Sequence, residues 1–454
     1  MPSPAFRPSL LAGLLALALG SVADARTPVL GDDPYPSTYR PVPAGPVLIR
    51  NATVLIGDGS RMDGADVLFR DGEIRRVGRE LDAPAGATVI EAEGRWVTPG
   101  LIDVHSHLGV FPAPALDAHQ DVNEMTNPIT AQVWAEHGIW PQDPGFATAL
   151  AGGVTSLLVL PGSANLIGGR SIVLKNVPAE TYQAMKFPGA PWSLKMACGE
   201  NPKRVYGQLR NVAPMTRMGN VAGYRNAFID AREYLEKLDD EEPPKQDLRL
   251  ETLAAAMTGE IKVQVHCYRS DEMAIMLDLA EEFGFQIAAF HHAVEAFKIA
   301  DQMAEAGTCG ALWADWWGFK AEAWDSIPEN LLLVERGGGG TGCGIVHSDS
   351  PEGIQRLNQE AAKMIGTARR IGIEISPEHA IRWITQNPAR AMGILDRTGT
   401  LQRGKMADVV LWNQNPFSVY ARADKVWIDG ALLFDRNDPT RQPVSDFLLG
   451  KDHY

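Results

Sequence analysis

Two histidines one residue apart, His105 and His107, end an apolar stretch that begins at residue 97. In a β-strand, side chains at positions i and i+2 point to the same face of the sheet, so both imidazoles can reach one metal ion. An isolated His-x-His pair is more often accidental than functional. Here the pair follows a Pro99-Gly100 turn and a short apolar strand, and this context favours a metal site. The fold must therefore place the end of a buried strand where an ion can bind.

After Gly100 the sequence alternates between buried apolar strands and helical stretches, which is typical of a parallel α/β architecture. Helices are expected over residues 270–283 and 376–394, each of which begins with capping residues. Eight such strands would close a distorted (β/α)8 barrel of the TIM type. The predicted strands are residues 101–104, 155–160, 193–197, 262–265, 286–290, 308–312, 331–333 and 345–347.

Short alternating strands with turn residues between them lie on both sides of this region, within residues 47–90 and 408–430. We expect the two chain ends to pair into one small composite β-sandwich beside the barrel. The predicted organisation is a signal peptide (1–25), an extended leader (26–45), a first sandwich segment (46–98), the barrel (99–396), a second sandwich segment (397–440) and a C-terminal tail (441–454).

The N-terminus has the pattern of a secretory signal. Arg7 precedes an apolar run over residues 10–19, and Ala23-Asp24-Ala25 is a small-x-small cleavage site. The run is shorter than the roughly 20 residues that a membrane-spanning helix needs. No cysteine lies near the cut, so no lipid anchor is expected. The sequence predicts a protein exported to the periplasm or secreted, and the alternative is a disordered or membrane-interfacial N-terminus.

Charge and cysteine content exclude several classes of protein. The 454-residue chain has a net charge of -14 and a pI of about 5.2, which argues against nucleic acid or an anionic membrane as the main partner. Its cysteines lack the CxxC spacing of a zinc ribbon. Export would permit disulfides, but their apolar surroundings lead us to expect buried free thiols. The four are Cys198, Cys267, Cys309 and Cys343.

Further candidate ligands stand at the carboxyl ends of predicted strands, where the active sites of α/β barrels collect. His266 ends one strand, the pair His291-His292 ends the next, and Asp349 follows the strand at residues 345–347. We expect His292 to be the ligand of its pair, because small Ala293 follows it, with His291 as the alternative. His266 could instead be a core histidine, and Asp349 a helix cap. Imidazole with carboxylate suits zinc better than iron, nickel or manganese.

The candidate ligands stand in a characteristic order with four sequence segments, the first of which contains His105 and His107. The segments are residues 99–107 (PGLIDVHSH), 152–156 (GGVTS), 387–391 (NPARA) and 404–410 (GKMADVV). Over about residues 46–435 the chain resembles the amidohydrolase superfamily, in particular its imidazolonepropionase-like and N-acetylglucosamine-6-phosphate deacetylase-like branch. The resemblance implies a distorted (β/α)8 barrel with a composite β-sandwich and one or two divalent ions that activate water. It also implies that Asp349 accepts and returns a proton, and that the metal ligands are His105, His107, His266, His292 and Asp349.

Two residues, Glu200 and Lys195, are candidates for the bridge between two ions. Many members of the superfamily use a carboxylated lysine, which Lys195 matches, and others use a glutamate in a Glu-x-Pro setting, which Glu200 matches. The separation from Glu200 to His266 favours Glu200, with Lys195 as the alternative bridge. Lys195 could instead be a buried lysine paired with a carboxylate. Glu200 could instead cap a helix, or pair with Lys203 or Arg204.

Substrate contacts are expected next to the ligands. Tyr268 and Arg269 directly follow His266, and the guanidinium of Arg269 can clamp a substrate carboxylate through two hydrogen bonds. A structural ion pair is an equal alternative for Arg269. The loop at residues 161–170 can line the pocket, but it lacks the GxGxxG pattern of a nucleotide site. The tryptophan-rich segment at residues 313–317 can form an aromatic wall.

The sequence predicts a metal-dependent hydrolase that cleaves a carbon–nitrogen bond of a small substrate, such as an acylated amino acid, a dipeptide or a cyclic amide. One or two divalent ions per chain are expected, with zinc favoured. The alternatives are a mononuclear deaminase or cyclic-imide hydrolase of the same superfamily, and a non-catalytic periplasmic metal-binding protein. The expected partner is a small molecule, without nucleic acid or a membrane anchor, and a homo-oligomer is possible.

Overall fold

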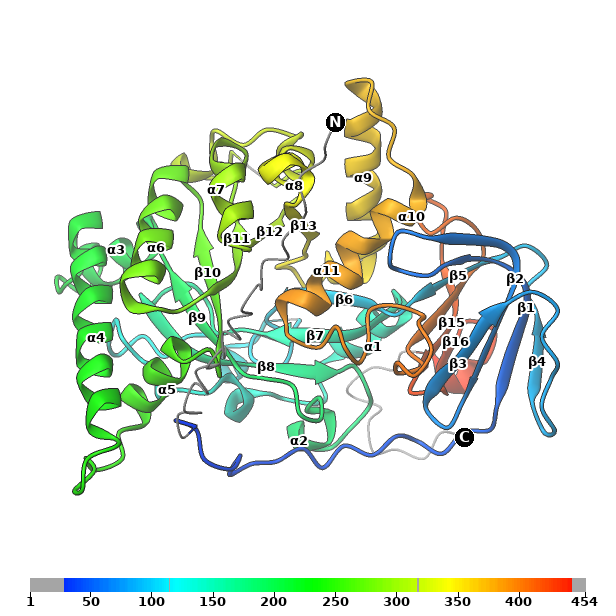
Figure 1. Cartoon of the computed structure of the whole chain (residues 1–454), viewed down its shortest axis with the longest axis horizontal. Helices are drawn as coiled ribbons and strands as arrows, with labels where there is room; N and C mark the ends of the chain where they lie inside the picture. The colour runs from blue at the N-terminus through cyan, green and yellow to red at the C-terminus, as the bar shows by residue number, and fades with distance from the viewer. Residues whose placement is uncertain (1–27, 114, 317, 443–454) are drawn as a thin grey trace, which may run out of the picture.

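The computed structural model describes residues 28–113, 115–316 and 318–442, so the predicted signal peptide lies outside the described residues. Two sheets organise this part of the chain (Figure 1). The central sheet is a nearly closed barrel of eight described strands, which confirms the predicted fold class. In spatial order its strands are β13 (Cys343–Val346), β12 (Cys309–Leu312), β11 (Ile287–His292), β10 (Lys262–Cys267), β9 (Ser193–Ala197), β8 (Ile167–Lys175), β7 (Val154–Val159) and β6 (Leu101–Ser106).

One barrel strand differs from the prediction. Strand β8 is antiparallel to both β7 and β9, and it includes the end of the segment that the sequence predicted as a pocket loop, residues 161–170. All nine residues of β8 are buried, but Arg170 and Lys175 among them interrupt its apolar pattern. The predicted strand at residues 331–333 is wrong, because this segment lies in a helix. Three apolar residues are too few to distinguish the period of a strand from that of a helix.

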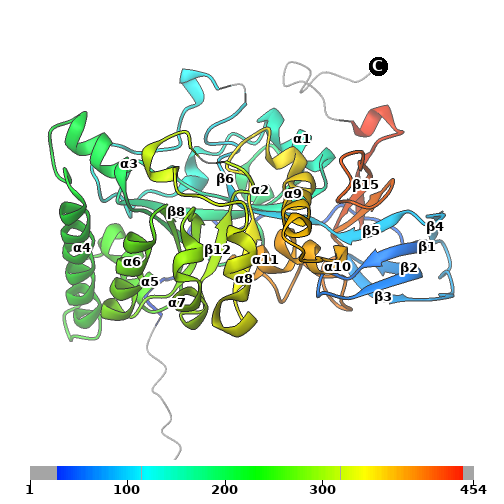
Figure 2. The same ribbon diagram turned by 90° about the horizontal axis from the view of Figure 1, so that it is seen from above.

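Helices cover the outside of the barrel (Figures 1 and 2). The helix predicted at residues 270–283 is confirmed, whereas the one predicted at 376–394 is broken into two helices and a 3-10 turn at Ile381–Ile384. Pro388 lacks the N–H group that a continuous helix would need. The helices are α1 (Pro144–Ala151), α2 (Tyr182–Met185), α3 (Glu200–Lys203), α4 (Arg217–Lys237), α5 (Leu248–Met257), α6 (Ser270–Phe283), α7 (Ala300–Glu305), α8 (Asn330–Gly340), α9 (Leu357–Arg370), α10 (Pro377–Ala380) and α11 (Gln386–Ala391).

Both chain ends contribute to the second sheet, as predicted (Figure 1). Val97 of the N-terminal segment pairs with Leu411 of the C-terminal segment in antiparallel register, and both side chains are buried. From the N-terminal segment the sheet takes β1 (Val47–Leu55), β2 (Arg61–Arg70), β3 (Glu73–Gly78), β4 (Thr88–Glu91) and β5 (Trp96–Pro99). From the C-terminal segment it takes β14 (Val409–Trp412), β15 (Ala423–Ile428) and β16 (Ala431–Asp435).

Gly100 joins the two sheets, since β5 ends directly before it and β6 begins directly after it. A Cβ atom at this position would lie 2.0 Å from the hydroxyl oxygen of Thr155 on β7, so any side chain would clash. The Pro-Gly step therefore allows the barrel's first two strands to pack closely. It also fixes where the strand that carries the His-x-His pair begins.

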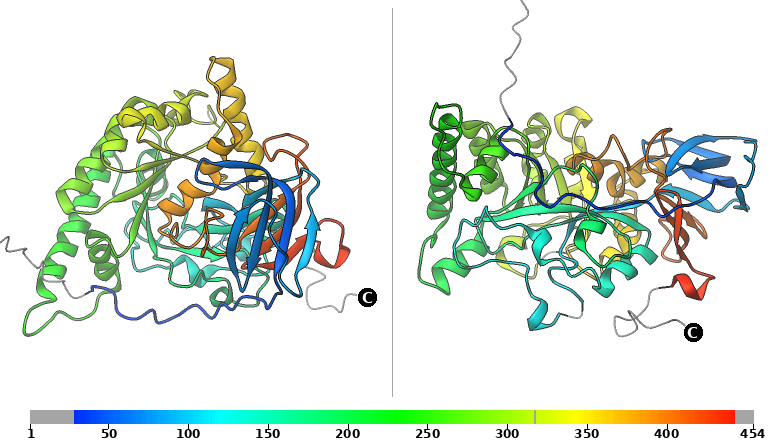
Figure 3. Two further views of the ribbon diagram at one scale, coloured as in Figure 1. Left: turned by 45° about the vertical axis from the view of Figure 1, so that its right-hand side comes forward. Right: turned by 90° about the horizontal axis from the view of Figure 1, so that it is seen from below.

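The predicted leader is an extended segment that crosses the underside of the barrel towards the second sheet (Figure 3). The backbone N–H groups of Val29 and Leu30 each donate to the carboxylate of Glu260 at 2.9 Å. Further along, the hydroxyl of Tyr39 donates to Asp429 at 2.5 Å. These contacts fasten the segment at both of its ends. Within the described part of the chain, no helix is long and apolar enough to cross a membrane.

The expectation of free thiols is wrong, because the four cysteines form two disulfides between neighbouring barrel strands. Cys198 pairs with Cys267 at the carboxyl ends of β9 and β10, and Cys309 pairs with Cys343 at the amino ends of β12 and β13. Cys309 and Cys343 lie directly opposite each other in the strand register. This proximity depends on the register of the barrel, which the spacing of cysteines along the chain does not reveal.

Each disulfide should contribute to stability by restricting the unfolded chain. The bonds join residues 69 and 34 positions apart, for which the chain-entropy relation gives about 4 kcal/mol each. Replacing both cysteines of either pair with serine should lower the free energy of unfolding in urea by about this amount. Unchanged urea midpoints for both double variants would contradict this expectation.

Candidate metal centre

The His-x-His pair meets Asp349 where the first and last barrel strands approach each other. The Nε2 atoms of His105 and His107 each lie 3.3 Å from Oδ1 of Asp349. The backbone N–H of Asp349 donates to the carbonyl of His105 at 3.2 Å, which connects the segment after β13 to β6. His105 is fully buried, whereas the side chains of His107 and Asp349 are 20% and 21% exposed. The group is therefore open to solvent on one side only.

The two histidines at the end of β11 have different surroundings. Nδ1 of His292 lies 3.8 Å from Oδ2 of Asp349 and has no hydrogen-bond partner in the described part of the chain. His291 uses both ring nitrogens elsewhere, because its Nδ1 is 2.8 Å from Nδ1 of His105 and its Nε2 is 2.8 Å from Oε1 of Gln264. The geometry thus favours His292 as the ligand and gives His291 the position of a residue that orients His105.

Two of these residues have unusual backbone conformations. His292 and Asp349 have φ angles of 69° and 51°, in the left-handed region that side chains other than glycine's disfavour. His292 is the last paired residue of β11, and Asp349 comes three residues after β13 ends. The turned backbone directs the side chain towards the other ligand candidates instead of continuing the alternation of the strand. Strain of this kind, about 1 to 3 kcal/mol per residue, is concentrated at functional sites.

His266, at the carboxyl end of β10, completes the predicted set. Its ring centroid is 4.6 Å from that of His292, and the ring is buried. Nδ1 of His266 has no hydrogen-bond partner, while Nε2 is 3.3 Å from the side-chain nitrogen of Asn201. A metal at His266 would therefore bind either the unpartnered Nδ1 or, by displacing Asn201, Nε2.

His347 belongs to the same cluster, although it was not among the residues expected from the sequence. Its ring centroid lies 5.1 Å from that of His105 and 5.0 Å from that of His292. The ring is buried, and neither of its nitrogens has a hydrogen-bond partner among the described residues. The spacing His347-Ser348-Asp349 repeats the i, i+2 relation of the first pair, and this was the signal that could have identified it.

The donor set fits a divalent cation. Among the described residues, five buried ring nitrogens of the cluster lack a hydrogen-bond partner, and each such group costs about 1 to 3 kcal/mol if nothing satisfies it. The ligand atoms also lie close together, within 4.8 Å of one another in each of two overlapping groups. The groups are His105, His292 and His347, and His105, His107 and Asp349.

The protonation states agree with a metal site. Burial lowers the pKa of His105, His266 and His292 well below the usual value, so these imidazoles are neutral and offer lone pairs. Burial alone would raise the pKa of Asp349. The neighbouring His292 and a hydrogen bond with His107 outweigh that effect, so the pKa of Asp349 lies well below the usual range and the group is a carboxylate.

The structure places the two candidate bridges differently. Lys195 is fully buried on β9, and its Nζ has no hydrogen-bond partner among the residues that the structure describes. Its charge acts on His105, His266 and Asp349. Burial lowers the pKa of Lys195 to about 8. Glu200 stands at the start of α3, where its carboxylate lies 3.3 Å from Nζ of Lys320. The geometry therefore brings Lys195 to the cluster and leaves Glu200 in an ion pair.

The local chain path explains why the two candidate bridges have different surroundings. Lys195 lies opposite Gln264 in the register of β9 and β10, and Gln264 contacts His291 inside the barrel. Glu200 comes three residues after β9 ends, and Gly199 before it turns the chain with a φ of 80°. A residue beyond that turn no longer follows the alternation of the strand, so its spacing from His266 is a poor guide.

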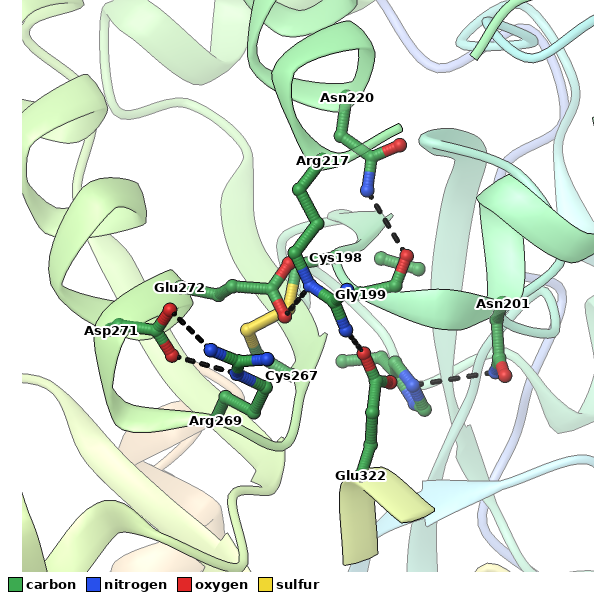
Figure 4. The surroundings of a disulfide bond; sticks show 12 residues. Cys198, Gly199, Asn201, Arg217, Asn220, Cys267, Arg269, Asp271, Glu272 and Glu322 are labelled. Atoms are coloured by element: carbon green, nitrogen blue, oxygen red, sulfur yellow. Dashed lines mark hydrogen bonds and ion pairs between the residues drawn. A yellow bond between two sulfur atoms is a disulfide. The ribbon is translucent and has the colours of Figure 1, made fainter. Parts of the chain in front are cut away.

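The two residues predicted to contact substrate, Tyr268 and Arg269, also have different surroundings. Tyr268 is buried, and its ring centroid lies 4.7 Å from that of His266 and 5.6 Å from that of His292. Arg269 instead forms a two-point ion pair with Asp271, at 2.8 and 2.9 Å, and its side chain is 42% exposed (Figure 4). Its predicted clamp role is not supported, because the partner two residues away already occupies the guanidinium.

An aromatic wall stands beside the cluster. The ring of Trp313 stacks on His292 with centroids 4.2 Å apart and an interplanar angle of 27°. The same ring lies 5.8 Å from that of Trp316 and 5.8 Å from that of Phe319. The position of the tryptophan-rich segment therefore agrees with the wall expected from the sequence.

Comparisons with known proteins point to one superfamily. The profile described as "Amidohydrolase family" matches residues 349–434. The amidohydrolase tasK of Hapsidospora irregularis is 35% identical over 456 residues, which cover 90% of this chain and 44% of that protein. This chain thus spans less than half the length of that relative. An imidazolonepropionase of Mesorhizobium japonicum is 27% identical over 387 residues, covering 76% of this chain and 86% of that protein.

A solved structure extends the similarity to the whole fold. The crystal structure of an amidohydrolase from Thermotoga maritima has a TM-score of 0.78 and 34% sequence identity to this chain. The alignment covers 86% of this chain and 100% of the other. Sequence identity at this level over a complete chain indicates shared ancestry as well as a shared architecture.

The different surroundings of His291 and His292 predict different effects on metal binding. His292→Ala should remove a ligand and weaken zinc binding by more than a hundredfold. His291→Phe removes only the partner that orients His105, and loss of such a partner typically weakens binding between about 10- and 100-fold. Competition with a chromophoric chelator measures both affinities. The reverse order of the two variants would show that His291 is the ligand.

Proposed function

Because this chain belongs to the amidohydrolase superfamily, we propose that it is a metal-dependent hydrolase that cleaves a carbon–nitrogen bond of a small substrate. The observation that carries the proposal is the convergence of unpartnered, neutral imidazoles on the carboxylate of Asp349. The imidazole-rich donor set suits zinc. The residues that would hold the metal are His105, His107, His266, His292 and Asp349, with His347 as a further donor.

When bound, a divalent ion lowers the pKa of a coordinated water from about 15.7 to about 7 and polarises a carbonyl group. Asp349 would then accept the proton of the attacking water and return it to the departing nitrogen. Its carboxylate lies at the partly exposed side of the cluster, where substrate can approach. Trp313 and Tyr268 provide a flat aromatic surface next to His292, which can hold a planar amide and limit access of bulk water.

We also propose that Lys195, as a carboxylated lysine, is the bridge between two ions. The support is a fully buried amine without a hydrogen-bond partner, located among the candidate ligands. Carboxylation would join the neutral amine to carbon dioxide with release of one proton, and the resulting carbamate has two oxygens, one for each ion. The ion pair of Glu200 with Lys320 argues against the glutamate alternative.

Export to an oxidising compartment is also proposed. Its support is the signal-like N-terminal sequence together with two disulfides, which persist in the periplasm or outside the cell and are rare in the cytosol. The substrate class includes cyclic amides as well as acylated amino acids and dipeptides. The similarity to a protein named imidazolonepropionase supports the inclusion of cyclic amides.

Metal content and amide hydrolysis test the proposed function together. The purified wild-type protein should contain stoichiometric divalent metal and hydrolyse members of a panel of amides. Asp349→Asn should lower kcat between about 100- and 10,000-fold, because a general acid–base group is lost. Asp271→Asn, at an exposed carboxylate paired with Arg269, is the matched control and should retain activity. A metal-free protein whose His105→Ala variant matches the wild type on every amide would refute the proposal.

The number of ions separates the binuclear proposal from its alternatives. Elemental analysis should give two equivalents for the wild type and for Glu200→Gln, and at most one for Lys195→Ala. A ¹³C resonance of a carbamate, after growth with labelled bicarbonate, should accompany only the proteins that retain Lys195. One equivalent in the wild type would favour a mononuclear deaminase or cyclic-imide hydrolase. Bound metal without any hydrolysis would favour a non-catalytic metal-binding protein.

A further inference from the structure

Lys320 places an ammonium group next to the candidate metal centre. Its Nζ lies 4.2 Å from the ring centroid of Tyr268, the residue that contacts both His266 and His292. Nζ also donates to the side-chain oxygen of Asn201 at 2.9 Å, and the amide nitrogen of Asn201 is 3.3 Å from Nε2 of His266. Tyr268 and Asn201 therefore each connect this ammonium to His266, a candidate ligand.

Three of the neighbouring cations are committed to other contacts, while Arg204, whose charge also acts on Lys320, is exposed. Arg269 pairs with Asp271 through two hydrogen bonds, and Arg217 is held between Glu272 and Glu322 (Figure 4). Lys195 is fully buried inside the barrel. Lys320 differs from all three, because its side chain is 19% exposed and has one carboxylate partner, Glu200, at 3.3 Å. A substrate arriving from solvent can reach this ammonium.

The ion pair with Glu200 shows that the ammonium of Lys320 can bind a carboxylate. Glu200 contributes one carboxylate oxygen to Nζ, and its side chain is 29% exposed. An ammonium has three N–H donors, of which Asn201 and Glu200 account for two. A carboxylate on a ligand can therefore bind to the third donor, or replace Glu200 while that side chain turns to solvent. In the second case the Glu200 carboxylate occupies, in this structure, the position that the ligand's carboxylate would take.

The aromatic surroundings strengthen an interaction between charges. The ring centroid of Phe319 is 5.8 Å from Nζ of Lys320, and Tyr268 provides a second ring at 4.2 Å. Aromatic rings exclude water, and a charge-assisted hydrogen bond is worth more where the local dielectric constant is low. The same rings continue to Trp313, which stacks on His292, so the ammonium and the cluster share one wall.

We infer that Lys320 binds a carboxylate of the substrate, and that the site prefers amides that carry a free carboxylate close to the scissile carbon–nitrogen bond. This inference rests on the proposed function and specifies its substrate class. N-acyl amino acids, dipeptides and cyclic amides with a carboxylate side arm meet the requirement. Lys320 takes over the anchoring role that the sequence had suggested for Arg269.

Matched pairs of compounds test this inference on the full-length, metal-loaded protein. Each pair is an N-acetyl amino acid, a dipeptide or a carboxylate-bearing cyclic amide together with its carboxamide, which has the same shape without the charge. In the wild type kcat/KM should favour the acid. Lys320→Gln should lower the acid-to-carboxamide ratio between about 10- and 150-fold, mainly through KM, as expected for one charged hydrogen bond. Lys320→Arg should restore part of the preference.

Glu200→Gln distinguishes an anchor from a structural ion pair. If Glu200 competes with the substrate carboxylate, removing its charge should lower KM for the acids, in the direction opposite to Lys320→Gln. If the pair only supports the fold, both variants should act in the same direction on acids and carboxamides alike. Arg269→Gln is the control for a nearby cation and should leave the ratio unchanged.

Calorimetric titration of the same pairs into the Asp349→Asn variant measures the preference without turnover. Equal binding or turnover of acids and carboxamides by the wild type would overturn the role of Lys320, while hydrolysis of either series would leave the proposed function in place. Failure to bind metal and to hydrolyse any compound would instead overturn the proposed function. Binding of the acids that is lost in Lys320→Gln and retained in Arg269→Gln is the supporting result.

Discussion

The arrangement of the whole site depends on the contact between the first and last strands of the barrel. The N–H group of Asp349 donates to the carbonyl of His105, and the hydroxyl of Ser348 donates to the carboxylate of Asp103. These bonds bridge the gap between β13 and β6, which are the two ends of the strand order. They join residues more than 240 positions apart and set the carboxylate of Asp349 3.3 Å from both histidines of the first strand. The contacts that close the barrel therefore also assemble the candidate metal centre.

Much of this site could be predicted from the sequence, because it depends on local rules. The i, i+2 relation of His105 and His107 requires only a strand, and His266 and Asp349 require only that parallel strands end at one edge. The same rule applied to His347 would have added it. What could not be predicted depends on register and on distant partners. Lys195 reaches the cluster because it lies opposite Gln264, and the disulfides form because Cys309 lies opposite Cys343. No pattern within either strand contains that information.

The residues expected to bind substrate show the same contrast between local sequence rules and distant partners. Arg269 follows a ligand directly, which suggested a role, but Asp271 two residues later holds its guanidinium. Lys320 is 54 positions from His266 in the sequence, yet Asn201 and Tyr268 connect it to that ring. The second sheet and the leader contact the barrel from outside, whereas Asn201, Tyr268 and Lys320 lie at its carboxyl edge. Family membership therefore accounts for the chemistry of the centre, whereas the surrounding loops determine which carbon–nitrogen bond reaches it.

The most direct test of the account is a crystal structure of the zinc-loaded protein with anomalous diffraction data collected at the zinc absorption edge. The account predicts two peaks about 3.5 to 4 Å apart at the carboxyl edge of the barrel. Nε2 of His105 and a carboxylate oxygen of Asp349 should lie within bonding distance of the zinc, and density should extend beyond Nζ of Lys195. Absence of any peak at this edge, or a zinc ion that touches neither His105 nor Asp349, would contradict it.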